Sequence, residues 1–319
     1  MRIAITGASG FVGSGVVPYL VSKNHQVLAL CRSESSAAKA RALGAEAVVL
    51  DLFEPEAVAR TLAGRDAVVH MAARLEFFGP YADFQRDNVE LTRILTGATR
   101  AAGVSRFIYV GAAAVVIGAP GSQPYDESTP HGPAPAGAYG TTKAIAETHV
   151  LEAGTDPELN TIVLRPPMVW GKSAPAFDAI ADSVRGGQFM WIDGGHYSVG
   201  TIHVDNLAAA IASALDTPTA TGTFFVTDGE SIAFRDLVSA ALQARGVKPP
   251  RMSLPRPVVY LSAWLMEAVW RLLRLKGAPP ITRIIVELIG GELRVSDAKA
   301  REELGYTNRV SITEGLAGL

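Results

Sequence analysis

The chain has little of what marks several classes of protein. Among its 319 residues there is one cysteine, Cys31, so no disulfide can form within the chain. A lone thiol in a sequence of this kind is typical of a reducing cytoplasm. The formal net charge is only −2, which gives no indication of a nucleic-acid partner. We therefore expect a cytoplasmic protein that binds no nucleic acid and holds no metal.

We also expect neither a leader nor a membrane-crossing segment. The chain opens directly on the apolar stretch Arg2–Thr6, without the basic start and cleavage site of a signal peptide. A helix-like apolar segment at 257–276 would nearly span a bilayer, but Glu267, Arg271 and Arg274 interrupt it. These three charges fall at i, i+4 and i+7 and predict one polar stripe. Three interpretations stay open: peripheral contact with a membrane, a lid over an apolar substrate, or an ordinary packed helix.

What the chain does have is an alternation of short apolar runs with longer helix-like segments. Hydrophobic residues make up 48% of the chain, enough for a sizeable core. Near-continuous apolar runs are typical of strands buried on both faces of a parallel sheet. The predicted strands are Arg2–Thr6, Gln26–Leu30, Glu46–Leu50, Asp66–His70, Arg106–Val110, Thr161–Arg165 and Thr223–Thr227. The helical patterns include Glu56–Leu62, Asn88–Ala102 and Tyr139–Ala153. The pattern predicts an α/β fold with a doubly wound parallel sheet of the Rossmann type.

The alternation loosens after Gly171, where pairs of prolines and glycines become frequent. We expect residues 1–170 to form the dinucleotide-binding domain, with 200–228 returning to it. Residues 171–199 and 229–319 are expected to form a smaller, mostly helical substrate cap over the carboxyl edge of the sheet.

A glycine-rich turn follows the first predicted strand. Gly7 permits a tight turn, Gly10 lets backbone amides approach a pyrophosphate, and Gly13 lets the next helix pack on the strand. A strand before the motif and a helix after it are the context that supports a dinucleotide site. The alternative is an ordinary glycine-rich turn.

The end of the second predicted strand bears on the type of cofactor. No acidic residue stands there to hold both ribose hydroxyls of NAD, whereas Arg32 offers a guanidinium fork to a 2′-phosphate. This favours NADP(H). If Arg32 is a solvated loop residue or stacks on adenine, NAD(H) would still bind. Asp51, which follows the third strand, either meets the adenine edge or caps its own loop.

Tyr139 and Lys143 lie one helical turn apart at the start of a predicted helix and therefore share a face. A phenol is a poor acid, with an ordinary pKa near 10. A nearby ammonium stabilises the phenolate and makes its proton more available. Behind a dinucleotide turn, this pair points to reduction of a carbonyl or oxidation of an alcohol.

These motifs together resemble the extended short-chain dehydrogenase/reductase family over nearly the whole chain. Within that family the sequence is most similar to the 3β-hydroxysteroid dehydrogenase and sterol dehydrogenase branch. The general match rests on Thr6–Gly13, His70–Ala73, Tyr139–Lys143, Leu164–Met168 and Ile202–Asn206. The closer match rests on Gly222–Asp228, the apolar segment from Pro255, Val295–Lys299 and Leu304–Tyr306.

The resemblance implies roles for particular residues. Tyr139 would be the acid/base, and Lys143 would hold the nicotinamide ribose and tune Tyr139. Asp205 and Asn206 are expected to fix helix and loop positions. The expected cofactor-binding residues are Gly7, Ser9, Gly10, Phe11, Val12, Gly13, Arg32, Ser33, Asp51, Leu52, Met71, Ala72, Ala73, Tyr139, Lys143, Pro166, Pro167 and Met168.

One residue of the family's pattern is absent. The family usually places a Ser or Thr after the strand Arg106–Val110 to bind the substrate oxygen. Counting from either end of this stretch puts that position at Ala112 or Ala113, and both are alanine. Another donor could substitute, with Thr142 and Ser173 as candidates. Otherwise the hydroxyl was removed by engineering, or this branch turns over slowly or acts on an unusual substrate.

Together with the preference drawn from Arg32, the resemblance implies an NADP(H)-dependent oxidoreductase that interconverts a hydroxyl and a ketone on a small hydrophobic, steroid-like substrate. Three alternatives stay open: a reductase of long-chain β-keto acids, an epimerase or dehydratase of nucleotide sugars, and a non-catalytic NADP-binding regulator. A homodimer is compatible with the sequence.

Overall fold

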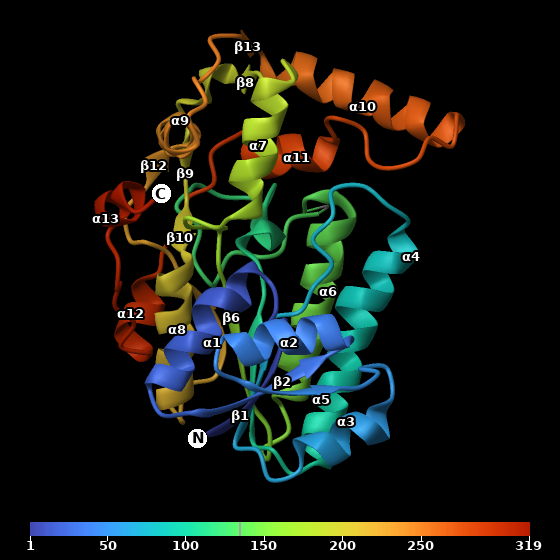
Figure 1. Ribbon diagram of the computed structural model, residues 1–319, viewed down its shortest axis with the longest axis vertical. Helices are drawn as coiled ribbons and strands as arrows, with labels where there is room; N and C mark the ends of the chain where they lie inside the picture. Colours follow the sequence, from blue (N-terminus) through green and yellow to red (C-terminus); the bar gives the residue numbers. More distant parts are fainter. Residues whose placement is uncertain (134) are drawn as a thin grey trace.

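A computed structural model describes residues 1–133 and 135–319. Its centre is a seven-stranded sheet in the order β11-β6-β5-β4-β1-β2-β3, and every neighbouring pair is parallel (Figure 1). The strands are β1 (Arg2–Thr6), β2 (Gln26–Cys31), β3 (Glu46–Val49), β4 (Ala67–His70), β5 (Arg106–Val110), β6 (Asn160–Arg165) and β11 (Gly222–Phe225). The Rossmann-type fold class is confirmed, and the ends of the predicted strands differ from the observed ones by at most two residues. Strand β11 lies beside β6, so the chain returns to the sheet after leaving it at β6.

Helices cover both faces of the sheet. On one face, α1 (Phe11–Ser22), α2 (Glu34–Ala42) and α8 (Val204–Asp216) share a core cluster with Ile108 and Val110 of β5. On the other, α3 (Pro55–Leu62), α5 (Leu91–Ala101) and α6 (Gly137–Ala153) share a core cluster with Phe107 and Tyr109. Because both faces are covered, the strands are apolar throughout rather than alternating.

The helix predicted over Asn88–Ala102 differs in its first turn. The structure has a short helix α4 (Tyr81–Phe84), a π-helical segment η1 (Gln85–Glu90) and only then α5. Asn88 is buried and its side-chain oxygen accepts from the backbone N–H of Arg74, 2.7 Å away. Asn88 lies in the wider π-helical turn, and its partner Arg74 lies outside that turn. The spacing of apolar residues along the sequence cannot predict such a contact.

The remaining elements lie beyond the carboxyl ends of the main strands, at the top of Figure 1. Three short two-stranded sheets pair β7 (Met168–Trp170) with β10 (Thr201–His203), β9 (Ser198–Val199) with β12 (Ile232–Ala233), and β8 (Trp191–Ile192) with β13 (Ser253–Leu254). The helices of this region are α7 (Pro175–Arg185), α9 (Phe234–Ala244), α10 (Arg256–Leu272) and α11 (Arg283–Ile289).

The stretch after α11 departs from the predicted cap. Helix α12 (Ala298–Glu303) contacts β11, and Ala300, Leu304 and Tyr306 are buried in the core beneath the main sheet. The Tyr306 hydroxyl donates to the Thr227 carbonyl, 2.7 Å away. This part of 229–319 therefore packs with the sheet, and the last helix, α13 (Ile312–Ala317), contacts α9.

The polar stripe predicted for the 257–276 segment forms only in part: Arg271 Nη2 donates to Glu267 at 3.3 Å, as their spacing predicts. Glu267 is buried and accepts hydrogen bonds from Arg283 of α11, with a shortest distance of 2.8 Å. Arg274 lies beyond the end of α10 at Leu272. The acidic residue thus points inward to a partner distant in sequence, while apolar side chains face out. No helix within residues 1–133 and 135–319 has both the length and the apolar character needed to cross a bilayer.

Candidate active site

The turn after β1 has the shape that a dinucleotide requires. Gly7 has φ +78°, and a Cβ there would stand 2.9 Å from the backbone N of Ala72. A Cβ on Gly13 would stand 2.2 Å from the Ala8 carbonyl oxygen. Helix α1 has no acidic residue in its first turn and no side-chain cap. Its amides, together with Ser9, Phe11 and Val12, could therefore hold a pyrophosphate.

A buried polar chain fixes the neighbouring exit of β4. The Thr6 hydroxyl lies 2.7 Å from His70 Nδ1 and accepts from the Ala72 N–H at 3.2 Å. His70 Nε2 lies 3.0 Å from the Thr92 hydroxyl. Burial, followed by the charge of Lys143, lowers the pKa of His70 to about 3, so this imidazole stays neutral. These hydrogen bonds position Met71, Ala72 and Ala73 across from the glycine-rich turn.

The end of β2 carries the residues expected to select the cofactor. Arg32 is exposed, and Ser33 caps α2 through its hydroxyl, which accepts from the Ser36 N–H at 3.3 Å. Asp51 accepts from the Phe53 N–H at 2.9 Å, the loop-capping arrangement, and Leu52 is buried. The Arg86 guanidinium stacks 4.4 Å from the centre of the Phe53 ring. This second cation beside the loop was not singled out from the sequence.

Tyr139 lies near the start of α6 in apolar surroundings. Ala136 and Gly137 have φ of +43° and +60° and turn the chain into the helix. The tyrosine packs in a cluster whose other members are Ala112, Ala114, Ile117, Ala136, Ile284 and Leu288. Burial raises the pKa of Tyr139 to about 12.

Lys143 is 2% exposed and turns toward β5. Its Nζ donates to the Val110 carbonyl at 2.7 Å and lies 4.1 Å from the centre of the Tyr109 ring. Burial lowers the pKa of Lys143 to about 7, and the Glu147 carboxylate opposes that shift. Within the described residues no hydrogen bond joins Lys143 to Tyr139. The ammonium would therefore have to leave the Val110 carbonyl before it could lower the pKa of the Tyr139 phenol.

A buried ion pair lies one turn farther along α6, and sequence reasoning missed it. Glu147 is fully buried and accepts from Arg165 Nε at 3.1 Å and from His131 Nε2 at 2.9 Å. Burial alone would raise the pKa of Glu147, but these hydrogen bonds outweigh it and the pKa lies below its usual value. The spacing of four residues from Lys143 was the available signal, since it places the two side chains on one helix face.

The alanines after β5 do not all face the same way. Ala112 and Ala114 share the cluster of Tyr139, whereas Ala113 is fully buried in an adjoining cluster with Ala144 and Phe225. The N–H of Ala113 donates to the carbonyl of the buried Pro166 at 2.8 Å. This bond ties the loop to the Pro166–Pro167–Met168 segment expected beside the nicotinamide.

Neither proposed substitute donor lies with these alanines. Thr142 is fully buried, donates to the Ala138 carbonyl at 2.7 Å and accepts from Asn88 Nδ2 at 3.0 Å. Its hydroxyl is therefore engaged on the side of η1. Ser173 lines a separate hollow together with Phe11 and His203. The Thr142 hydroxyl is therefore not placed to replace the missing Ser or Thr, and that interpretation is corrected.

Helix α11 covers Tyr139, and its part in the site was not predicted from the sequence. Ile284 and Leu288 pack on the alanines, and a Cβ on Gly137 would stand 2.6 Å from Ile284 Cγ1. Helix α10, proposed from sequence as a lid, packs on the far side of α11 through Val259 and Ala263.

Asn206 has a structural role. Its Nδ2 donates to the Asp228 carboxylate at 2.7 Å and its Oδ1 accepts from the Val310 N–H at 2.9 Å. Asp228 also accepts from Trp170 Nε1 at 2.7 Å and from the Thr201 hydroxyl at 2.8 Å. Asp205 is within 3.8 Å of His203. Asn206 thus holds α8 and its neighbours in place, whereas the Asp205 carboxylate stays partly exposed.

A comparison with known protein families finds a match that includes the main sheet and the glycine-rich turn. Residues 3–226 match the model of the NAD dependent epimerase/dehydratase family. The chain belongs to this family. It is an NAD(P)-dependent dehydrogenase or reductase that acts on CH–OH groups.

Three relatives of this family member match it along its length. A 4-hydroxy-2-methyl-3-oxo-4-farnesyl-3,4-dihydroquinoline-1-oxide ketoreductase of Stigmatella aurantiaca is 35% identical over 100% of this chain and 96% of its own. A decarboxylating sterol-4-alpha-carboxylate 3-dehydrogenase of Dictyostelium discoideum is 30% identical over 99% and 98%. A 2-alkyl-3-oxoalkanoate reductase of Stenotrophomonas maltophilia (strain K279a) is 33% identical over 100% and 98%. The predicted resemblance to the extended dehydrogenases and their sterol branch is confirmed.

Proposed function

We propose that this family member is an NADP(H)-dependent oxidoreductase that interconverts a hydroxyl and a ketone on a hydrophobic substrate. The observation that carries the proposal is the apolar cluster around Tyr139, formed by alanines, Ile117, Ile284 and Leu288. A charged group placed beside Tyr139 would lose hydration without a partner, whereas an apolar one gains by burial. The three relatives have names that contain farnesyl, sterol and alkyl groups, which supports the same choice.

The chain's own residues supply the proton. Tyr139 would give its proton to the substrate oxygen in reduction and take it back in oxidation. The nicotinamide, when bound, supplies or accepts the hydride. Its phosphates would be held by the turn from Gly7 to Gly13, and a 2′-phosphate by Arg32. Lys143 would leave the Val110 carbonyl for the ribose and place its ammonium near the phenol.

The proposal is tested by NADPH oxidation across steroid ketones, long-chain β-keto acids and UDP-sugars. We expect turnover with one of the first two classes. Tyr139→Phe should lower kcat by roughly 10²–10⁴-fold while NADPH binding stays nearly unchanged, because only the positioned acid is lost. Activity in the Phe variant equal to that of the wild type would show that another residue is the acid.

A β-keto acid reductase is the second candidate, favoured by the relative from Stenotrophomonas maltophilia. Turnover confined to β-keto acids in the same panel would select it over the steroid-like assignment. Turnover of UDP-sugars alone would contradict both, and NADPH binding without any turnover would point to a regulator.

A further inference from the structure

We propose that α10 and the loop before α4 form a docking surface for an anionic lipid membrane. The surface consists of the outward side of residues 256–276 together with residues 75–81. This inference does not depend on the reaction proposed above.

The first argument is the concentration of exposed apolar side chains. Sixteen large hydrophobic residues are exposed in the described chain, and nine of them fall between 258 and 275. Leu272 is 82% exposed and Leu261 58%. The nine are Val258, Tyr260, Leu261, Trp264, Leu265, Val269, Leu272, Leu273 and Leu275. Single exposed apolar residues are ordinary, but a contiguous patch on one helix marks an interaction site.

The second argument is that the orientation of α10 is fixed. The helix is held along a narrow stripe formed by Val259, Ala263 and Glu267, which are all buried. Arg283 anchors Glu267 from α11, with a shortest distance of 2.8 Å. Turning the apolar side chains inward would expose Val259 and Ala263 and break this buried ion pair, so the outward face is part of the fold.

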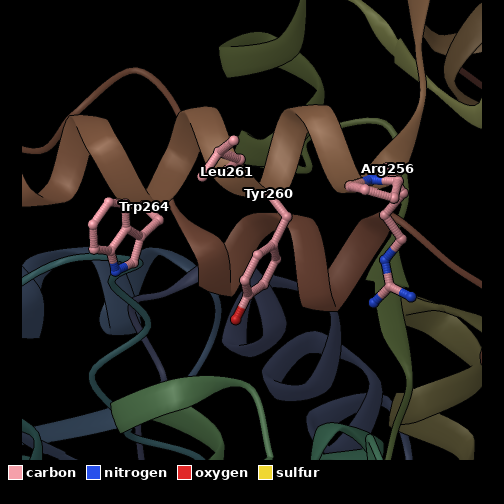
Figure 2. A pocket seen from close by; sticks show the side chains of 5 residues that line it. Arg256, Tyr260, Leu261 and Trp264 are labelled. Atoms are coloured by element: carbon pink, nitrogen blue, oxygen red, sulfur yellow. The ribbon is translucent and has the colours of Figure 1, made fainter.

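The position of α10 at the edge of the molecule agrees with a helix that lies along a membrane surface. In Figure 1 α10 lies at the periphery of the molecule, above α11 and far from the N-terminus. Figure 2 shows Tyr260 and Trp264 pointing to one side of the helix and Leu261 to another. Tyr260 leans toward α11, where its hydroxyl donates to Glu287 Oε1 at 3.3 Å, so the more outward side is that of Leu261. Together with Arg256 and Pro257 the three labelled side chains line an open hollow of about 660 Å³. Aromatic side chains of this kind favour the boundary between water and acyl chains.

The third argument is charge, which selects an anionic membrane as the occupant. Within the proposed surface, residues 256–276 contain four cationic residues, all exposed, and one acidic residue, the buried Glu267, while residues 75–81 contain one exposed acidic residue, Glu76. The whole chain has a net charge of −2, so positive charge is concentrated here. The four cationic residues are Arg256, Arg271, Arg274 and Lys276, and the exposed Lys248 and Arg251 precede them in the chain. Apolar residues rimmed by Lys and Arg are the pattern of an interfacial helix.

A second segment extends the same surface. Leu75 is 61% exposed, Phe77 37% and Tyr81 47%. The Arg271 guanidinium lies 5.7 Å from the centre of the Phe78 ring, which places this loop against the end of α10. The two segments are far apart in sequence but could enter one lipid surface together.

The test is co-sedimentation with vesicles of phosphatidylglycerol mixed with phosphatidylcholine, and with phosphatidylcholine alone. We expect the wild-type chain to bind the mixed vesicles, and added salt to weaken that binding. The double variant L265E/L272E should bind at least about tenfold more weakly, because two exposed leucines that would enter the lipid are lost. R274Q/K276Q should lose about tenfold on the mixed vesicles, through two surface charges, and little on neutral ones.

Ile145→Glu is the matched control, since Ile145 is 41% exposed on α6, outside the proposed surface. All variants should keep the wild-type Tm. Absence of vesicle binding by the wild type, or an equal loss in Ile145→Glu, would overturn the proposal. So would a lower oligomeric mass of L265E/L272E by sedimentation velocity without vesicles, since α10 would then join copies of this chain.

Discussion

Arg32 is a single exposed side chain, yet the choice between two cofactors depends on it. We expect NADPH to bind at least tenfold more tightly than NADH, because one charge-assisted bidentate contact contributes about 1.5–3 kcal/mol. Arg32→Ala should remove the preference in fluorescence titrations with both cofactors, and Arg86→Ala serves as a comparison at the neighbouring cation. Equal affinities in the wild type would contradict the prediction.

Ala112 and Ala113 are neighbours in sequence, but their packing gives them different consequences. Charge develops on the substrate oxygen during hydride transfer, and a well-aimed donor at such an oxygen is worth on the order of 10²–10³ in rate when removed. We expect Ala112→Ser to raise kcat at least fivefold on the best ketone, because Ala112 shares the cluster of Tyr139. Ala113→Ser should do little, since Ala113 is fully buried against Ala144 and Phe225.

The two variants are compared in steady-state kinetics after NADPH binding is verified for both. A gain at Ala113 alone would show that the substrate oxygen lies on the other side of the loop. No gain at either position would mean that a different donor already serves this oxygen.

Lys143 links the site to the pH dependence of stability. Its pKa is about 7 in the folded chain and about 10.4 in an unfolded one. Below pH 7 both states carry the charge, and the folded state bears the full cost of burying it. Between pH 7 and about 10 only the unfolded state keeps the proton, so this cost is relieved and stability rises with pH.

We therefore expect Lys143→Met to raise the free energy of unfolding more at pH 6 than at pH 9, by on the order of 3 kcal/mol. Urea unfolding of both proteins at the two pH values measures the difference. Parallel pH profiles for the variant and the wild type would show that Lys143 is not strongly desolvated.

Among the elements, α11 bears on substrate selection because Ile284 and Leu288 cover Tyr139. Leu288→Ala should raise KM for an apolar substrate about tenfold or more, through the loss of roughly 1.5–3 kcal/mol of apolar contact. Trp264→Glu on α10 is the comparison, and its KM should stay near the wild-type value because α10 packs behind α11. The opposite ranking of the two variants in steady-state kinetics would make α10 the lid.

The sequence predicted the elements whose signals are local. Seven apolar runs gave the seven strands of the sheet, and the Gly7–Gly13 turn and the Tyr139/Lys143 spacing needed only short stretches of chain. Long-range pairs were not accessible in this way. The inward orientation of Glu267 depends on Arg283, which is 16 residues later.

The same limit explains the parts of the site that were missed. Helix α11, which covers Tyr139, lies about 145 residues farther along the sequence. Glu147 is buried with its charge because Arg165 and His131 reach it from two other segments. Thr142 was a candidate donor because it lies near Tyr139 along the helix. Its hydroxyl turned out to be engaged by Asn88 of η1, a contact that no helix period contains.

At the scale of the whole molecule, the sheet gathers the expected cofactor residues at one edge, so cofactor binding should stabilise the chain as a unit. Strands β1, β2 and β4 lie side by side, and each is followed by expected cofactor contacts. A ligand that binds only the folded state stabilises it by about 2.7 kcal/mol at a hundred times its Kd.

The single thiol offers a way to time openings of this edge. Cys31 is the last residue of β2, immediately before Arg32, and is 5% exposed. Burial raises its pKa, and a hydrogen bond with Ser36 partly opposes that shift. Alkylation by N-ethylmaleimide should therefore wait for a local opening of the strand and run at least about a hundredfold slower than on a free thiol. Because each chain accepts only one label, intact mass spectrometry would follow the labelled fraction with time, and saturating NADPH should slow the labelling.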